Sequence, residues 1–236
     1  TLLLATSSTN AAAPYLYSKL GFDPVSDFTP VVSLCSIPNV MVVPTKSPWN
    51  SLKDIVDASK KSPGDFTYGS AGIGGSQHLA GAQFKTAANI DIRHVPYKGS
   101  GPATIDLIAG RTQVFFSTVP TILSHINANS VELVAVTGSK RLGLFPQTPS
   151  TSEFGLKDFD ISTWWGILAP ANTPKDIVAK LNQAINEVSN KDAVKGRLLN
   201  EGAIITTGSP MDFQSNLNNE LRMWRNLVKT AGLKGS

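Results

Sequence analysis

Apolar positions along the chain come in short runs, and small or polar residues separate each run from the next amphipathic segment. These runs are short and rich in β-branched or aromatic residues, as strands are, and occupy residues 2–5, 66–69, 92–95, 113–116 and 132–136. Segments with helical spacing follow most of them; residues 51–60 place Leu52, Ile55 and Val56 on one face. Strands that alternate with helices in this way predict βαβ units, a mostly parallel sheet and an α/β fold.

Two apolar segments frame most of this pattern. Residues 39–44 read NVMVVP and residues 165–170 read WGILAP, and each is a strand-like run that ends in proline. A further strand is predicted at residues 28–34. We expect lobe 2 (44–166) to be inserted into lobe 1 (1–43 plus 167–236). Two such crossovers form a hinge, with a cleft between the lobes.

The pattern after residue 169 is mostly helical. Pro174 opens a helix whose predicted apolar stripe is Ile177, Val178, Leu181, Ile185 and Val188. Ser209 is predicted to cap a final helix. That helix is expected to bury Phe213, Leu217, Leu221, Trp224 and Val228.

Composition narrows the class of protein. Of 236 residues, 41% are hydrophobic and 16% charged, which excludes an intrinsically disordered chain. No run of about 18 apolar residues is present, so the sequence predicts no membrane span. One cysteine, Cys35, excludes an intramolecular disulfide, and three histidines leave little for a metal cluster. A net charge of +4 indicates a weak preference for anions and is too small to indicate a nucleic-acid-binding surface. The sequence predicts neither metal nor cofactor.

The strongest local signal is the glycine-rich stretch GSAGIGGSQH at residues 69–78, between a predicted strand and a predicted helix. Glycines let backbone N–H groups approach a ligand, and a helix N-terminus favours negative charge. The spacing matches neither a Walker A loop nor a GxGxxG fingerprint. Two interpretations stay open: a site for a carboxylate or phosphate, or a tight turn that Ser76 caps.

Polar groups follow other predicted strands at the same kind of junction. They are Thr6–Asn10 after the first strand, Lys98–Ser100 after the strand at 92–95, and Ser117-Thr118. Ligands of open α/β sheets bind at the carboxyl ends of strands. Each junction alone is typical of helix capping, but several at one edge favour a ligand rich in oxygen atoms.

Candidates for catalysis are weak, because the chain has no GxSxG or HExxH motif and no paired acid and base. His78 either reaches a ligand or packs, and His94 is expected to be structural. Trp164 either stacks on a ligand or packs at the hinge, and Tyr97 lies in a loop that follows a strand. We therefore expect a binding protein and not an enzyme.

The strings SAGIGGSQHLAGAQFK and IRHVPYKGSGPATIDLIAG, with the order of the remaining segments, resemble the Bug-type (TctC-type) periplasmic solute-binding proteins of tripartite tricarboxylate transporters. The resemblance implies a two-lobed type II periplasmic binding protein with two hinge crossovers. It also implies capture of a small organic carboxylate, either a di- or tricarboxylate or an aromatic carboxylate. The membrane subunits of the transporter are then the partners, and the Gram-negative periplasm is the location.

The resemblance also implies ligand-binding positions in the loops that follow strands. The positions that match are Ser7, Ser8, Thr9, Ala71, Gly72, Gly74, Gly75, Ser76, Ser117 and Thr118. Possible further contacts are His78, Tyr97 and Trp164. Position 117 is often aspartate in the family, and a serine there favours ligands that lack an ammonium group.

One departure from the family is expected at the N-terminus. Members carry an earlier strand, glycine-rich loop and helix, so we expect lobe 1 to lack that unit and the signal peptide before it. An alternative function is the ligand-sensing domain of a cytosolic transcription regulator, which can share the two-lobed fold. A signal peptide or a helix-turn-helix upstream would discriminate between the two.

Overall fold

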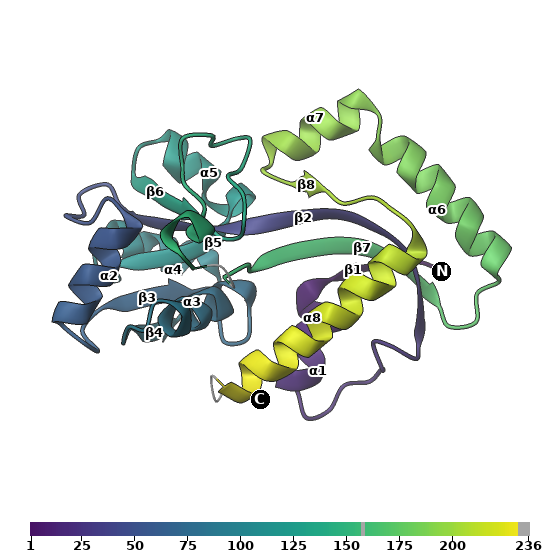
Figure 1. The fold of residues 1–236 in the computed structure, drawn as a ribbon, viewed down its shortest axis with the longest axis horizontal. Helices are drawn as coiled ribbons and strands as arrows, with labels where there is room; N and C mark the ends of the chain where they lie inside the picture. The colour runs from purple at the N-terminus through teal and green to yellow at the C-terminus, as the bar shows by residue number, and fades with distance from the viewer. Residues whose placement is uncertain (157–158, 231–236) are drawn as a thin grey trace. The chain divides into compact units, whose positions relative to one another are not determined.

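The chain folds into two compact units, described by a computed structural model for residues 1–156 and 159–230. Unit 1 comprises Thr1–Ile37 and Thr163–Ser236, and unit 2 comprises Pro38–Ser162. Both boundaries fall inside strands, β2 (Phe28–Pro44) and β7 (Ser162–Pro170) (Figure 1). The boundaries expected after residues 43 and 166 lie further along these same two strands.

Strand β2 is continuous, whereas the sequence predicted separate strands at 28–34 and 39–43. Before Pro38 it pairs with β8 (Ile204–Ile205), in the register Cys35 to Ile205. After Pro38 it pairs with β5 (Val114–Thr118) and β6 (Val131–Val136). Proline has no N–H to donate to a ladder, and Pro38 lies between the two sets of pairs, where no such bond is needed.

Unit 2 contains the predicted succession of strands and helices. Besides β5 and β6 its elements are α2 (Leu52–Lys61), β3 (Thr67–Ser70), α3 (Ser76–Ala87), β4 (Arg93–Pro96), α4 (Ser100–Ile108), α5 (Val119–Asn127) and η2 (Thr151–Phe154). Strand β3 pairs in parallel with both β4 and β5. The carboxyl ends of these three strands therefore meet at one edge, which brings the loops after Ser70, Pro96 and Thr118 together.

The core of unit 2 lies where β2 and β5 pack against α4 and α5. It includes the buried side chains Val40, Val42, Leu107, Phe115 and Ile122. Phe84 of α3 packs on Phe116 and Phe159. This packing fixes α3, and hence the start of α3, against the sheet edge.

Unit 1 contains β1 (Leu3–Thr6), η1 (Ser8–Ala12), α1 (Ala13–Leu16), α6 (Lys175–Ser189), α7 (Asp192–Asn200) and α8 (Pro210–Thr230), together with β7 and β8. Strand β1 pairs antiparallel with β7, placing Thr6 opposite Trp165. The strand pairs of the α/β fold are thus parallel around β3 and antiparallel along β1, β2 and β7.

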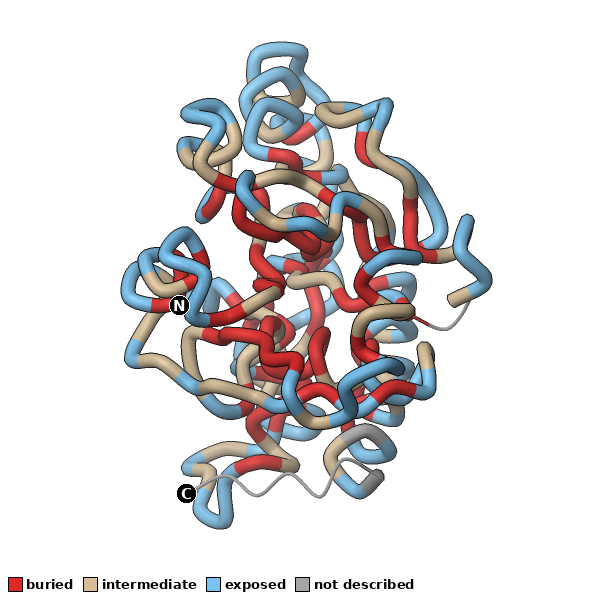
Figure 2. Tube along the Cα trace, turned by 90° about the vertical axis from the view of Figure 1, so that its left-hand side faces the viewer, coloured by how far each residue is buried: buried red, intermediate tan, exposed pale blue. Residues whose placement is uncertain are grey.

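The long helices of unit 1, α6 and α8, differ in how far their apolar side chains are buried. Figure 2 shows buried and exposed positions interspersed along the trace. Helix α8 buries Phe213, Leu217, Leu221 and Trp224, as predicted, and leaves Val228 half-buried. In α6 the prediction was wrong for Ile177 and Val188, whose exposed fractions are 45% and 51%. Leu181 and Ile185 pack against Val31, Val32 and Ala169, so the stripe that α6 buries is narrower than the apolar pattern predicts. Among the described helices, none combines the length and the apolar character that crossing a bilayer requires.

Candidate functional site

The glycine-rich loop joins the end of β3 at Ser70 to the start of α3 at Ser76, as the sequence predicts. The Ser70 hydroxyl donates to the Gly72 carbonyl at 2.9 Å and accepts the Gly72 N–H at 3.2 Å. The Gln77 side-chain oxygen accepts the Ala71 N–H at 2.6 Å. Gly72 and Gly74 have φ values of +151° and +81°, which other residues rarely adopt. Side chains from both flanking elements therefore hold the loop in one shape.

The His78 side chain also stabilises this loop, through a hydrogen bond to its backbone. Its ring is buried, and Nδ1 accepts the Gly74 N–H at 3.0 Å. The ring stacks on His94 of β4, with centroids 3.9 Å apart and planes 12° apart. His94 Nε2 lies 2.6 Å from the Ser70 hydroxyl oxygen. His94 is thus structural, as expected, and the only hydrogen bond to the His78 ring in the described chain is to the loop itself.

The loop amides fall into two sets. Those of Ala71, Gly72 and Gly74 donate to side chains of the flanking elements β3 and α3. In the described part of the chain, the amides of Ile73, Gly75 and Ser76 have no acceptor. The first turn of α3 carries no acidic side chain that would take this place. Unsatisfied amides at a helix N-terminus are suited to a carboxylate or another small anion.

The loop after β4 braces the glycine-rich loop. The Tyr97 and Gly99 amides donate to the carbonyls of Ser70 and Ala71 at 3.0 and 2.9 Å. The Tyr97 hydroxyl donates to Asp106 at 2.8 Å, and Asp106 also pairs with Arg111. Burial first, and then the bond to Asp106, raises the pKa of Tyr97. Tyr97 is half-buried and its hydroxyl is bonded to Asp106, so its role in the structure is to support the glycine-rich loop through its backbone amide.

Ser117 and Thr118 lie at the same sheet edge, where β5 ends. Ser117 is fully buried, and its hydroxyl donates to the Thr118 carbonyl at 3.3 Å. The Thr118 hydroxyl lies 2.9 Å from that of Thr121 in the first turn of α5. Unit 2 thus brings the expected positions 71–76 and 117–118 to one edge, and both hydroxyls at 117–118 also have local partners.

The expected residues at the start of the chain lie in unit 1, after β1. The Thr9 hydroxyl accepts the Thr6 N–H at 3.1 Å and lies 2.8 Å from the Asn10 side-chain oxygen. The π-helix η1 begins at Ser8, and single turns of π-helix are frequent at functional sites. The hydroxyl of Ser7 and the amide nitrogen of Asn10 are buried, and neither has a partner in the described chain. These two donors are the unsatisfied groups of this junction.

Trp164 lies in the packing between β7 and α8. It is buried against Phe213, with ring centroids 5.2 Å apart, and its indole N–H donates to Glu220. Burial raises the pKa of the Glu220 carboxyl to about 8. Sequence reasoning missed Glu220, although its spacing from Leu217 and Trp224 places this acid on the apolar face of α8.

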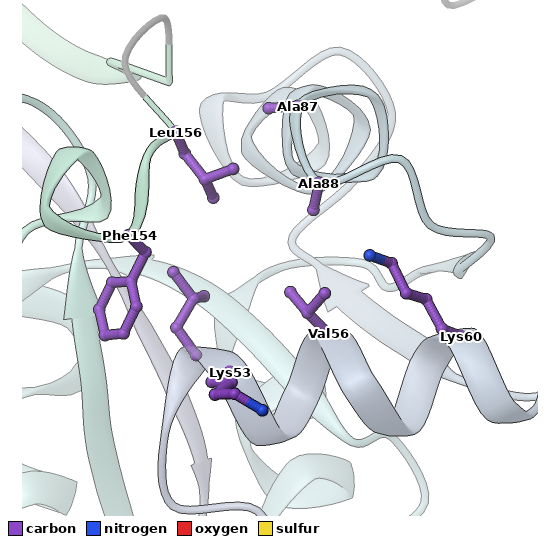
Figure 3. A pocket seen from close by; sticks show the side chains of 8 residues that line it. Lys53, Val56, Lys60, Ala87, Ala88, Phe154 and Leu156 are labelled. Atoms are coloured by element: carbon purple, nitrogen blue, oxygen red, sulfur yellow. The ribbon is translucent and has the colours of Figure 1, made fainter.

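A surface pocket of about 260 Å³ in unit 2 contains none of the expected residues. Figure 3 shows Lys53, Val56 and Lys60 of α2 on one side and Ala87 and Ala88 on another. Phe154 and Leu156 line the remaining side. In the described ranges no three His, Cys, Asp or Glu side chains gather as metal ligands do. The candidate site is therefore the sheet-edge loop and not this pocket.

A family model described as the tripartite tricarboxylate transporter family receptor matches residues 1–233. The chain belongs to this family. The resemblance seen in the sequence is thereby confirmed, and so is the expectation of a receptor class rather than an enzyme class. The family is one of periplasmic receptors.

Two curated relatives show how much of a family member the chain represents. A UPF0065 protein from the tcbD-tcbE intergenic region of Pseudomonas sp. (strain P51) is 34% identical over 91% of this chain, which spans 64% of that relative. Protein BugT of Bordetella pertussis is 30% identical over 99% of this chain, which spans 72% of BugT. The chain thus spans less than two thirds of the first relative.

Solved structures of the family share the fold. R. palustris Rpa4515 with adipate is 31% identical, with a TM-score of 0.88 over 100% of this chain and 79% of that one. MatC (Rpa3494) from Rhodopseudomonas palustris with bound malate is 26% identical, with a TM-score of 0.79 over 96% and 78%. These likenesses confirm the α/β fold of a periplasmic binding protein.

Proposed function

We propose that this receptor binds a small organic dicarboxylate and that one carboxylate of the ligand sits on the loop at residues 71–76. The observation that carries the proposal is the set of acceptor-free amides of Ile73, Gly75 and Ser76 at the start of α3. Three N–H groups and a helix N-terminus suit a carboxylate oxygen, and glycines leave the backbone open to it.

Unit 1 has candidate recognition groups of its own at the Thr6–Asn10 junction. Ser7 and Asn10 supply donors without partners, and Ser8 and Thr9 add further hydroxyls. Donors without a formal charge suit a ligand that is recognised by its oxygen atoms. Adipate and malate, present in the two similar structures, are both dicarboxylates and support this class.

The partners and location follow the family in this proposal. The chain would deliver its ligand, in the periplasm, to the membrane subunits of a tripartite tricarboxylate transporter.

The test uses a substitution that introduces an aspartate carboxylate at the proposed site. Gly75 is the N-cap of α3, with φ −75° and ψ 164°, and a Cβ there meets only the Gly72 carbonyl oxygen, at 3.9 Å. Gly75→Asp therefore fits, caps the first turn of α3 and places a carboxylate beside the free amides, where it competes with the ligand. Gly143→Asp adds the same charge at an exposed glycine with open space around it.

Calorimetry and thermal shift with adipate and malate decide the outcome. The unmodified chain and Gly143→Asp should bind, with stabilisation of about 2.7 kcal/mol at a hundredfold excess over Kd. Gly75→Asp should keep or raise its melting temperature and lose binding. Equal affinity in Gly75→Asp and Gly143→Asp would remove the loop from the ligand site.

A further inference from the structure

His78 and His94 form a neutral imidazole pair beneath the glycine-rich loop. Their stacked rings have centroids 3.9 Å apart, a separation at which two imidazolium cations would repel each other strongly. In the described chain no carboxylate lies within hydrogen-bond distance of either ring. Burial lowers the pKa of both side chains, and His78 lowers that of His94 further, to about 4.

The hydrogen bonds fix where the protons lie. The Gly74 N–H points at His78 Nδ1, so this nitrogen carries a lone pair and the neutral ring carries its proton on Nε2. The Ser70 hydroxyl has one proton, which it donates to the Gly72 carbonyl. His94 Nε2 is therefore the donor in its contact with Ser70. A proton on His78 Nδ1 would place two hydrogen atoms between His78 and Gly74 and break their bond.

The Gly74 bond also decides which loop amides remain open. Gly74 is buried with its N–H turned onto His78, whereas Gly75 and Ser76 are partly accessible and Ile73 is exposed. We propose that neutral His78 is a positioning residue, which fixes Gly74 so that the amides of Ile73, Gly75 and Ser76 point toward the ligand carboxylate. This inference rests on the proposed function and gives it a pH dependence.

The other titratable groups around α3 do not supply an alternative partner. Helix α3 packs on β3, β4 and β5, whose titratable side chains are Tyr68, Arg93 and His94. The Tyr68 hydroxyl donates to the His78 carbonyl, and burial raises its pKa; Arg93 is exposed. On α3, Lys85 pairs with Asp91. The segment at Phe159, which stacks on Phe84, adds Asp160, and burial raises the pKa of the Asp160 carboxyl.

Two substitutions at position 78 separate the hydrogen bond from the proton. In His78→Asn the side-chain oxygen takes the place of Nδ1, accepts the Gly74 N–H and does not titrate. In His78→Leu the acceptor is lost. His125→Asn is the matched control, because His125 lies at the end of α5 beside Ser130 and away from the loop.

The first measurement is the Kd for adipate and for malate between pH 5 and pH 8 by calorimetry. Below the pKa of His78 the affinity of the unmodified chain should fall by up to tenfold per pH unit, the limit for one proton released on binding. His78→Asn should bind within a few-fold at pH 7.5 and keep only the pH dependence that protonation of the ligand itself gives. His78→Leu should bind about tenfold more weakly at pH 7.5. His125→Asn should match the unmodified chain.

The second measurement needs no ligand and keeps the two proposals distinguishable. Amide hydrogen exchange of Gly74 should be slow in the unmodified chain and in His78→Asn, and about tenfold faster in His78→Leu. If no dicarboxylate binds to the unmodified chain, the proposed function fails while this exchange still tests the positioning. The inference is overturned if His78→Asn keeps the full pH dependence of the unmodified chain, if His125→Asn loses it, or if His78→Leu leaves both Kd and Gly74 exchange unchanged.

Discussion

The indole N–H of Trp164 donates to the side-chain oxygen Oε2 of Glu220, which joins β7 to α8 within unit 1. Trp164 is buried, and Glu220 lies on the apolar face of its helix, between Leu217 and Trp224. Burial raises the Glu220 pKa to about 8, so at pH 7 the carboxyl is mostly protonated. A neutral acid beside an indole N–H is compatible with the apolar surroundings, and ionisation of this acid is not.

Glu220→Gln should remove a pH dependence of stability. The folded pKa lies above the ordinary value of about 4.5, so the stabilising contribution is complete below pH 4.5 and is lost as the pH rises through 8. Glutamine accepts the Trp164 N–H without ionising. At pH 9 the variant should be more stable by about 2 kcal/mol, a figure reduced for partial solvation.

Urea unfolding at pH 5, 7 and 9 measures this difference. The matched control is Glu187→Gln, at an exposed position of α6, which should track the unmodified chain at every pH. Parallel stability curves for the unmodified chain and Glu220→Gln would show that the carboxyl is solvated in the folded state.

Gly81→Ala should destabilise the protein although alanine is the better helix former. A Cβ at Gly81 would lie 1.9 Å from the Tyr68 ring, which stacks on His94 and bonds the His78 carbonyl. Displacing that ring should cost about 1–3 kcal/mol. Gly196→Ala in α7 meets nothing within 4 Å and should stabilise by about 0.5–1 kcal/mol. Chemical denaturation measures the free energy of unfolding of both variants. A gain of stability in Gly81→Ala as well as in Gly196→Ala would contradict the close packing of Tyr68 on Gly81.

The sequence predicts the position of the glycine-rich loop but not the side-chain contacts that hold it. The glycine spacing and the strand before it locate residues 70–76 correctly, because turn and helix signals are local. The role of His78 depends on β3 pairing with β4 in the register Tyr68 to His94, which sets one histidine above the other. No local pattern contains a register between strands, so His94 could be expected only as structural.

The same limit applies to the continuous strand β2. Residues 35–38 look like an interruption because they include Pro38, and a local signal says nothing about which partners flank it. Pairing with β8 on one side and with β5 and β6 on the other makes the strand continuous. Glu220 is a different case. An acid within an apolar stripe is a visible signal in the sequence, but its partner Trp164 is distant in sequence, so the sequence does not show what the acid contacts.

Acidification should destabilise the protein through His94. Its folded pKa of about 4 lies below the ordinary 6.5, mainly because of burial and then because of His78. The unfolded chain binds the proton first, so stability is complete above pH 6.5 and is lost as the pH falls toward 4. His94→Gln retains a donor near the Ser70 hydroxyl without titrating, and should reduce the loss by about 1–2 kcal/mol, allowing for partial exposure.

Thermal unfolding at pH 7 and pH 4.5 tests this, with His125→Asn as the control histidine. The slope of stability against pH should be shallower in His94→Gln and unchanged in His125→Asn. An unchanged slope in His94→Gln would assign the acid sensitivity to other groups.

Ligand selectivity should follow from the neutral side chain at position 117. Ser117 is fully buried, and its hydroxyl is bonded to the Thr118 carbonyl, so it offers no charge to a ligand ammonium. The four-carbon acids L-malate and L-aspartate differ by one hydroxyl or ammonium group and make a matched pair. We expect malate to bind at least tenfold more tightly, because burying an unpaired ammonium is costly. Calorimetric titration with this pair, extended to succinate and glutamate, measures the preference. Tighter binding of the two amino acids would place a carboxylate from another residue in the site and would exclude recognition by hydroxyl and amide groups alone.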